Sequence, residues 1–230
     1  MRRIVCAIAF FCAGAFADVP ASERAALVDL YDATGGPSWT QSRNWLKGDP
    51  CVDKWGGIVC TPSPGRRSGG VKVNDTRRSN LLRPVSKDDA QEEAGDVDHV
   101  YHLNLAQNNL QGTLPESFGD LTSVSWIALD IFNSLTGTIP ASIGKMTDVT
   151  LFTIAGSAGG TAGDKFSGMI PSGICSLTNM FIFHAGSNRF TGVPDCFCDL
   201  TISNCDLSGN PLQCSQTPDC AKTICGATCT

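Results

Sequence analysis

The residues best suited to covalent or metal chemistry in this sequence are its cysteines. The 230-residue chain has 12 cysteines, which is an even number. Cys6 and Cys12 lie near the N-terminus, and the ten that follow are Cys51, Cys60, Cys175, Cys196, Cys198, Cys205, Cys214, Cys220, Cys225 and Cys229. Such a set forms disulfides in an oxidising compartment, or binds zinc through thiolates. The short spacings of Cys196 and Cys198, and of Cys225 and Cys229, are compatible with either kind of site. An apparent export signal favours disulfides, and the spacing leaves their pairing open.

Catalytic residues form no recognisable set. The three histidines are His99, His102 and His184, and none falls in a G-x-S-x-G, H-E-x-x-H or P-loop motif. The carboxylate pairs at 88–89 and 92–93 lie in a segment without periodicity, which is a poor platform for paired acid and base groups. We therefore expect a protein that is not an enzyme and that holds no cofactor and no metal ion.

The first 17 residues predict a secretory signal peptide. Arg2 and Arg3 precede an apolar run over 4–13, and Ala15-Phe16-Ala17 is a small-x-small site, so we expect cleavage after Ala17. The run is too short to span a bilayer, and no later segment qualifies. Loss of the two arginines changes the formal charge from −5 to −7. We expect a secreted, acidic protein with no transmembrane segment, and an acidic chain is poorly suited to binding nucleic acid.

Internal repeats are the main organising feature and occupy residues 98–213. The first reads Leu103-x-Leu105-x-x-Asn108-x-Leu110-x-Gly112-x-x-Pro115, and successive prolines follow at spacings of 25, 31 and 23 residues. Such periods predict a leucine-rich-repeat solenoid, because one turn cannot bury its apolar edge alone. The apolar pair points inward from a short strand, and the Asn side chain satisfies backbone groups where the chain leaves it. We expect an α/β repeat fold: a short right-handed solenoid of about five repeats, with a parallel sheet on its concave face.

The repeat register also predicts which side chains point outward from the concave sheet. Trp126, Leu151 and Ile182 form the centre of one column, and exposed apolar side chains of this kind often mark interaction sites. The alternative is that neighbouring insertions cover them. The predicted ligand-binding residues are His102, Asn104, Trp126, Ala128, Asp130, Leu151, Thr153, Ile182, His184, Asn204 and Asp206.

Both ends of the solenoid require caps. Ser22 can cap a helix whose apolar face includes Leu27 and Leu30. Trp45, Asp49-Pro50-Cys51, Trp55-Gly56-Gly57-Ile58 and Cys60 follow, and this series resembles the plant-type leucine-rich-repeat N-terminal cap. The resemblance implies a cap over 18–60 with a Cys51–Cys60 disulfide, plant-specific repeats, and a disulfide-rich C-terminal cap over 214–230. It places the chain beside receptor-like ectodomains and polygalacturonase-inhibiting proteins.

The segment 61–97 interrupts that pattern, because relatives place the first repeat soon after the second cap cysteine. Its composition predicts a mobile loop, with basic residues before acidic ones. It is either a solvated insertion, a basic arm for an anionic partner, or a misassigned exon. Asn74-Asp75-Thr76 is a glycosylation sequon, so Asn74 is a candidate glycan carrier.

We expect an extracellular recognition or adhesion module whose concave surface binds a protein, a peptide or a glycan. The resemblance also allows a secreted hydrolase inhibitor similar to the polygalacturonase-inhibiting proteins. A structural wall or matrix component is the third possibility. The sequence does not indicate the oligomeric state or the ligand, since repeat scaffolds keep their framework and vary their surface.

Overall fold

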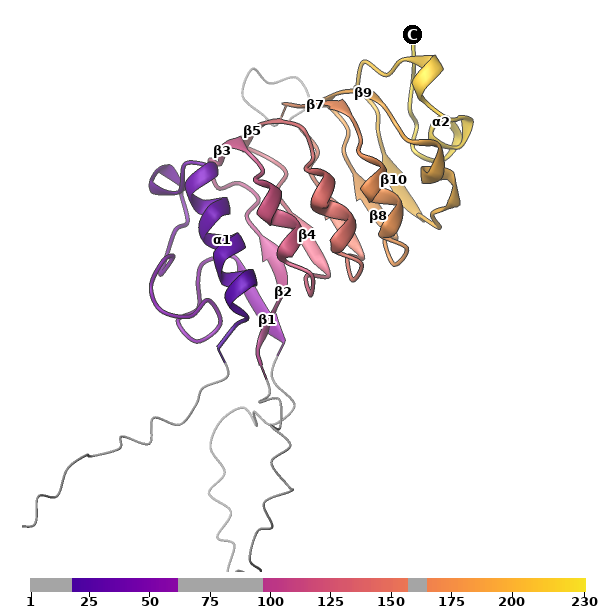
Figure 1. The fold of residues 1–230 in the computed structure, drawn as a ribbon. Helices are drawn as coiled ribbons and strands as arrows, with labels where there is room; N and C mark the ends of the chain where they lie inside the picture. Colours follow the sequence, from indigo (N-terminus) through magenta and orange to yellow (C-terminus); the bar gives the residue numbers. More distant parts are fainter. Residues whose placement is uncertain (1–17, 62–96, 157–164) are drawn as a thin grey trace, which may run out of the picture.

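A computed structural model describes residues 18–61, 97–156 and 165–230. The described chain forms a short solenoid with a cap at each end (Figure 1). Within these three ranges, no helix has both the length and the apolar character needed to cross a membrane. The predicted signal peptide, the sequon at Asn74 and nearly all of the 61–97 segment lie outside the described residues.

The concave layer is a six-stranded sheet in the order β1-β2-β4-β6-β8-β10. Five of its strands are parallel, one from each repeat, as predicted. The bounds are β1 Ile58–Thr61, β2 His99–Asn104, β4 Trp126–Ala128, β6 Leu151–Thr153, β8 Ile182–His184 and β10 Asn204–Asp206. The sixth strand, β1, pairs antiparallel with β2. The N-terminal cap thus extends the sheet by one strand.

The rest of each repeat forms a second layer behind the concave sheet. A second sheet takes the order β3-β5-β7-β9, and short 3-10 helices run alongside one another next to it (Figure 1). The strands are β3 Gln111–Thr113, β5 Ser134–Gly137, β7 Lys165–Met169 and β9 Arg189–Gly192. The helices are η2 Glu116–Asp120, η3 Ala141–Lys145, η4 Ser172–Ser176 and η5 Asp195–Asp199. Each begins directly after a repeat proline, whose fixed φ suits that position.

Between the layers, the repeat leucines and phenylalanines form one continuous core. A ladder of buried asparagines lies beside it, at Asn108, Asn133, Asn188 and Asn210. Asn133 shows the pattern: its amide donates to the carbonyls of Leu105 (2.9 Å) and Leu129 (2.8 Å), and its Oδ1 accepts from the backbone N–H of Leu110 (3.0 Å). The ladder predicted from the repeat consensus is therefore present, and each of its four asparagines bonds to the backbone of the preceding repeat or, for Asn108, of the cap.

The N-terminal cap is built around aromatic side chains. The helix α1 (Ala21–Ala33) packs against η2, and the short helix η1 (Gly36–Ser38) follows it. Helix α1 begins one residue before Ser22, and Ser22 does not cap it; Pro20 occupies the N-cap position, where its fixed φ suits the entry. Trp39, Trp45 and Trp55 are buried together. The ring centroid of Trp45 lies 4.7 Å from that of Trp39 and 5.0 Å from that of Trp55.

The predicted disulfides are confirmed for all ten cysteines. The pairs are Cys51–Cys60, Cys175–Cys196, Cys198–Cys220, Cys205–Cys225 and Cys214–Cys229. The pairing that the family resemblance implied for the N-terminal cap is correct. The terminal segment contains η6 (Cys214–Gln216) and α2 (Asp219–Ile224). Cys198–Cys220 and Cys205–Cys225 tie the last two repeats to it, Cys214–Cys229 closes it on itself, and Cys175–Cys196 joins η4 to η5. With its sulfurs in disulfides, this set has no thiolates to offer zinc, so the disulfide interpretation is the correct one of the two.

Candidate ligand-binding surface

The structure aligns the concave side chains in the register that the sequence predicted. In the first column His102 pairs with Trp126, Trp126 with Leu151, Leu151 with Ile182, and Ile182 with Asn204. The second column contains Asn104, Ala128, Thr153, His184 and Asp206 in the same order. These residues come from five repeats and lie on one continuous sheet face.

Exposure separates the members of the two columns. Trp126 is 42% exposed, whereas Leu151 and Ile182 are only partly exposed. Ala128 and Thr153 are each 8% exposed, so these two small side chains offer little surface to a ligand although they occupy the predicted register positions. Trp126 is therefore the main exposed apolar group of this surface.

A polar cluster lies just beyond the C-terminal end of β4, around Asp130. Burial raises the pKa of Asp130, while hydrogen bonds from the backbone and from the Thr153 side chain, and the nearby His184, lower it by smaller amounts. His184 Nε2 also contacts Asn204 Oδ1 at 3.0 Å. Four predicted residues from four repeats thus form one network. The acids of this surface are Asp206 in the second column and Asp130 just beyond β4. The columns also carry two histidines, and neither Lys nor Arg occupies a position in them.

The turn after β4 departs from the repeat consensus. Three residues, 130–132, separate Leu129 from the ladder residue Asn133, whereas two separate Leu105 from Asn108. Ile131 and Phe132 both have φ of 54° and are exposed. A β-branched residue at positive φ is strained, so the extra residue forces an unfavourable backbone conformation beside Asp130.

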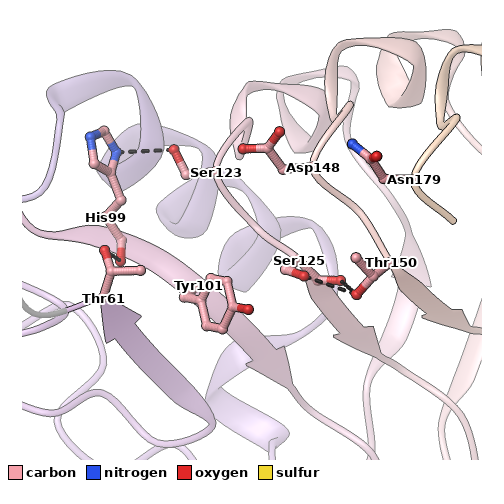
Figure 2. A pocket seen from close by; sticks show the side chains of 8 residues that line it. All are labelled: Thr61, His99, Tyr101, Ser123, Ser125, Asp148, Thr150 and Asn179. Carbon is pink, nitrogen blue, oxygen red and sulfur yellow. Dashed lines mark hydrogen bonds between the residues drawn. The ribbon is translucent and has the colours of Figure 1, made fainter.

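A second group of polar side chains lies at the rim where the strands begin, and no motif in the sequence predicted it. His99 Nδ1 lies 2.7 Å from Oε1 of buried Glu23 and 3.1 Å from Ser123 Oγ, and the latter contact is drawn in Figure 2. In a catalytic triad, the serine hydroxyl contacts one nitrogen of the histidine base and the orienting acid contacts the other nitrogen. Here both partners meet the same nitrogen, so Ser123, His99 and Glu23 are not arranged as a catalytic triad.

His99 and Glu23 instead hold the cap against the first repeat. The other carboxylate oxygen of Glu23 accepts a hydrogen bond from the backbone N–H of Val100 at 3.0 Å. The buried acid thus provides the hydrogen-bond acceptor for this backbone group of β2. In the described ranges, no group of three or more His, Cys, Asp or Glu side chains is placed to hold a metal ion.

Comparison with known proteins agrees with this architecture. The Leucine Rich Repeat family model matches residues 99–121, which is one repeat. The ectodomain of the receptor kinase SOBIR1 from Arabidopsis thaliana superposes with a TM-score of 0.58 at 18% identity, over 86% of this chain and 84% of that one. The chain folds as a leucine-rich-repeat solenoid similar to that ectodomain. The Arabidopsis receptor kinase HAESA ectodomain, solved in complex with a peptide hormone, gives a TM-score of 0.56 at 17% identity.

The alignment with the HAESA ectodomain covers 83% of this chain but only 25% of the HAESA chain. Identities of this size establish the fold alone. A search of curated protein sequences finds no match. The predicted fold class is therefore confirmed, and the ligand has to be argued from the side chains of this chain.

Proposed function

We propose that the protein is a secreted extracellular recognition module whose concave surface binds an extended peptide segment with a basic group. The observation that carries the proposal is that exposed Trp126 and the partly buried carboxyl of Asp130 belong to the same segment of the concave surface. An exposed Trp and an acid on one face offer an apolar anchor and a charge to one extended ligand.

The negative charge of the surface favours a positively charged ligand. Asp130 and Asp206 are its acids, and Lys and Arg are absent from its columns. Because Asp130 is partly removed from water, its ionised form gains by meeting a cation that replaces the lost solvent. The parallel strands lie about 4.8 Å apart, so the five repeat strands span roughly 20 Å, which suits a peptide of several residues.

The fold supports the same conclusion. SOBIR1 and HAESA are receptor-kinase ectodomains, and the HAESA structure contains a peptide hormone. Five disulfides are typical of a protein that folds in an oxidising compartment. A recognition module outside the cell is consistent with both.

The test is a selection of displayed random peptides on the purified mature protein, with counter-selection on Trp126→Ala. We expect enriched peptides to carry Lys or Arg, and to lose tenfold or more in affinity on Trp126→Ala because central Trp anchors dominate binding. Asp130→Asn is expected to lower the affinity of the basic peptides specifically. Met169→Ala, which removes an exposed apolar side chain from β7, is the matched control.

Peptides that bind wild type and Trp126→Ala equally would contradict the proposal. Unfolding of Trp126→Ala, seen by circular dichroism, would show instead that Trp126 supports the core. Inhibition of secreted hydrolases, assayed in parallel, distinguishes a recognition module from an inhibitor that uses the same surface.

A further inference from the structure

A separate cavity of about 450 Å³ opens at the rim of the concave sheet, where the strands begin (Figure 2). Tyr101 of β2 lies at its base, Ser123 and Ser125 precede β4, Asp148 and Thr150 precede β6, and Asn179 precedes β8. None of these residues belongs to the two concave columns. We propose that this rim cavity binds a neutral saccharide, with Tyr101 against the sugar ring and Asp148 and Asn179 on its hydroxyls.

Tyr101 provides a fixed aromatic platform. Its side chain is 39% exposed although it belongs to a strand of the sheet. Its ring stacks on His102 with centroids 4.5 Å apart and planes 27° from parallel, and His102 contacts Trp126 in turn. The electron-rich face of an aromatic ring attracts the weakly positive C–H groups on the flat face of a pyranose. A ring that neighbours already hold loses little conformational entropy when a sugar stacks on it.

The hydroxyl groups of the cavity are ordered before any ligand arrives. Thr150 Oγ1 donates to the carbonyl of Ser125 at 3.0 Å, which uses its single hydrogen. In the 2.9 Å contact between the two hydroxyls, Ser125 Oγ is therefore the donor and Thr150 the acceptor. The lone pairs of Ser125 Oγ remain able to accept a hydrogen bond. Figure 2 shows Ser125 and Thr150 together on the same side of the cavity as Tyr101.

Opposite the tyrosine, Asp148 and Asn179 supply complementary hydrogen-bonding groups (Figure 2). Asp148 is exposed, and within the described ranges it makes no hydrogen bond or ion pair, so both carboxylate oxygens can accept. Asn179 donates one amide hydrogen to the carbonyl of Thr147 at 3.0 Å, which orients its amide and leaves a second donor. A sugar hydroxyl both donates and accepts, so these acceptors and this donor match hydroxyls of a short oligosaccharide that extends from Tyr101 across the neighbouring strands.

The charges of the cavity exclude acidic glycans. Among the described residues that line it there is neither Lys nor Arg, and the Nδ1 of its histidine, His99, is engaged with Glu23. Asp148 would repel the carboxylate of a uronate or a sulfate group. A volume of about 450 Å³ lies within the range of about 300–1,000 Å³ that small-molecule sites occupy. Hydroxyl, amide and aromatic groups together favour a short neutral oligosaccharide.

The test is calorimetric titration of the mature protein with cellotetraose, mannotetraose and xylotetraose, with tetragalacturonate as the anionic counterpart. We expect at least one neutral tetrasaccharide to bind with a dissociation constant below about 1 mM. Tyr101→Ala is expected to weaken it about five- to tenfold, because it removes the stacking face. Asp148→Asn keeps the shape of the side chain but removes the charge and one acceptor, and is expected to weaken binding about threefold or more.

Phe181→Ala is the matched control, since Phe181 is a 47% exposed aromatic residue just before β8 that does not line the cavity. Its binding is expected to equal that of wild type, and thermal melts check that each variant folds. The proposal is overturned if no neutral tetrasaccharide binds at about 10 mM, if tetragalacturonate binds more tightly, or if Tyr101→Ala and Asp148→Asn bind as wild type does. Saccharide binding that is lost only in Trp126→Ala would move the site to the concave columns and also overturn it. Because peptide selection reports on Trp126 and these titrations on Tyr101, the two proposals fail independently.

Discussion

Replacing Asn133 by Ala tests whether the asparagine ladder holds the solenoid together. Asn133 is fully buried. Its amide donates to Leu105 and Leu129, and its Oδ1 accepts from the backbone N–H groups of Asn108 (3.1 Å) and Leu110 (3.0 Å). The substitution removes four hydrogen bonds and leaves two buried N–H groups without this partner. Each such donor costs about 1–3 kcal/mol, so we expect a loss of about 3–4 kcal/mol in the free energy of unfolding.

The assay is denaturant unfolding of the oxidised mature protein, followed by circular dichroism and by tryptophan fluorescence. Asn104→Ala is the control, because Asn104 is an exposed asparagine on a neighbouring strand and its loss is expected to change stability by less than about 0.5 kcal/mol. Asn133→Asp separates the two halves of the network, since it keeps the acceptor oxygens but loses the donor and adds a buried charge. It is expected to be at least as destabilising as alanine. A loss below about 1 kcal/mol for Asn133→Ala would refute the reasoning, because the backbone would then be satisfied without the side chain.

Three further changes test other features. Burial raises the pKa of Asp130 above its ordinary 3.8, so the folded protein binds this proton more tightly than the unfolded chain and ionisation disfavours folding. Asp130→Asn is therefore expected to stabilise the protein slightly at pH 7, by no more than about 0.5 kcal/mol given the partial exposure, and thermal melts should show this gain disappear below about pH 3.8. Ile131→Gly is expected to stabilise the fold by up to about 1 kcal/mol, since it relieves a φ of 54° at a β-branched residue, and a lower melting temperature would contradict this. Replacing Cys214 and Cys229 together by Ala opens a bridge between residues 15 apart and is expected to cost about 3 kcal/mol in denaturant unfolding, whereas an unchanged midpoint would show that the C-terminal cap does not need it.

The repeat architecture could be predicted because its signals are local and repeated. Leu103 and Leu105 fix the direction of one strand, and copies at similar spacing fix the register of the next, which is why the paired columns through Trp126 were obtained residue by residue. Exposure was less predictable, because it depends on neighbours from other repeats. Thr153 has the strand position of an outward residue, yet it is buried and hydrogen bonds to Asp130 of the preceding repeat.

Pairings between distant segments left no trace in the sequence. Cys198 has several possible partners in the C-terminal segment, and only the fold brings Cys220 to it. The same holds for β1, whose four residues look like the end of the cap but add an antiparallel strand to the sheet. Glu23 reaches His99 across 76 positions, so neither residue predicts the other.

The rim cavity escaped prediction for a related reason, which concerns the limits of a repeat consensus. Alternation along β2 turns Leu103 inward and His102 outward, and it assigns Tyr101 to the inner side with Leu103. Tyr101 is nevertheless exposed, while its counterpart in the next repeat, Ser125, is buried and its counterpart in the fourth, Phe181, is exposed. The consensus does not define this position: β2 already includes Tyr101, whereas β4 and β8 begin one residue after Ser125 and Phe181. The residue types at this position also differ between repeats, so a site made from Tyr101, Asp148 and Asn179 belongs to this chain rather than to the repeat. Periodicity therefore predicts the scaffold and the concave columns, whereas the side chains of the rim cavity fall outside the repeat consensus.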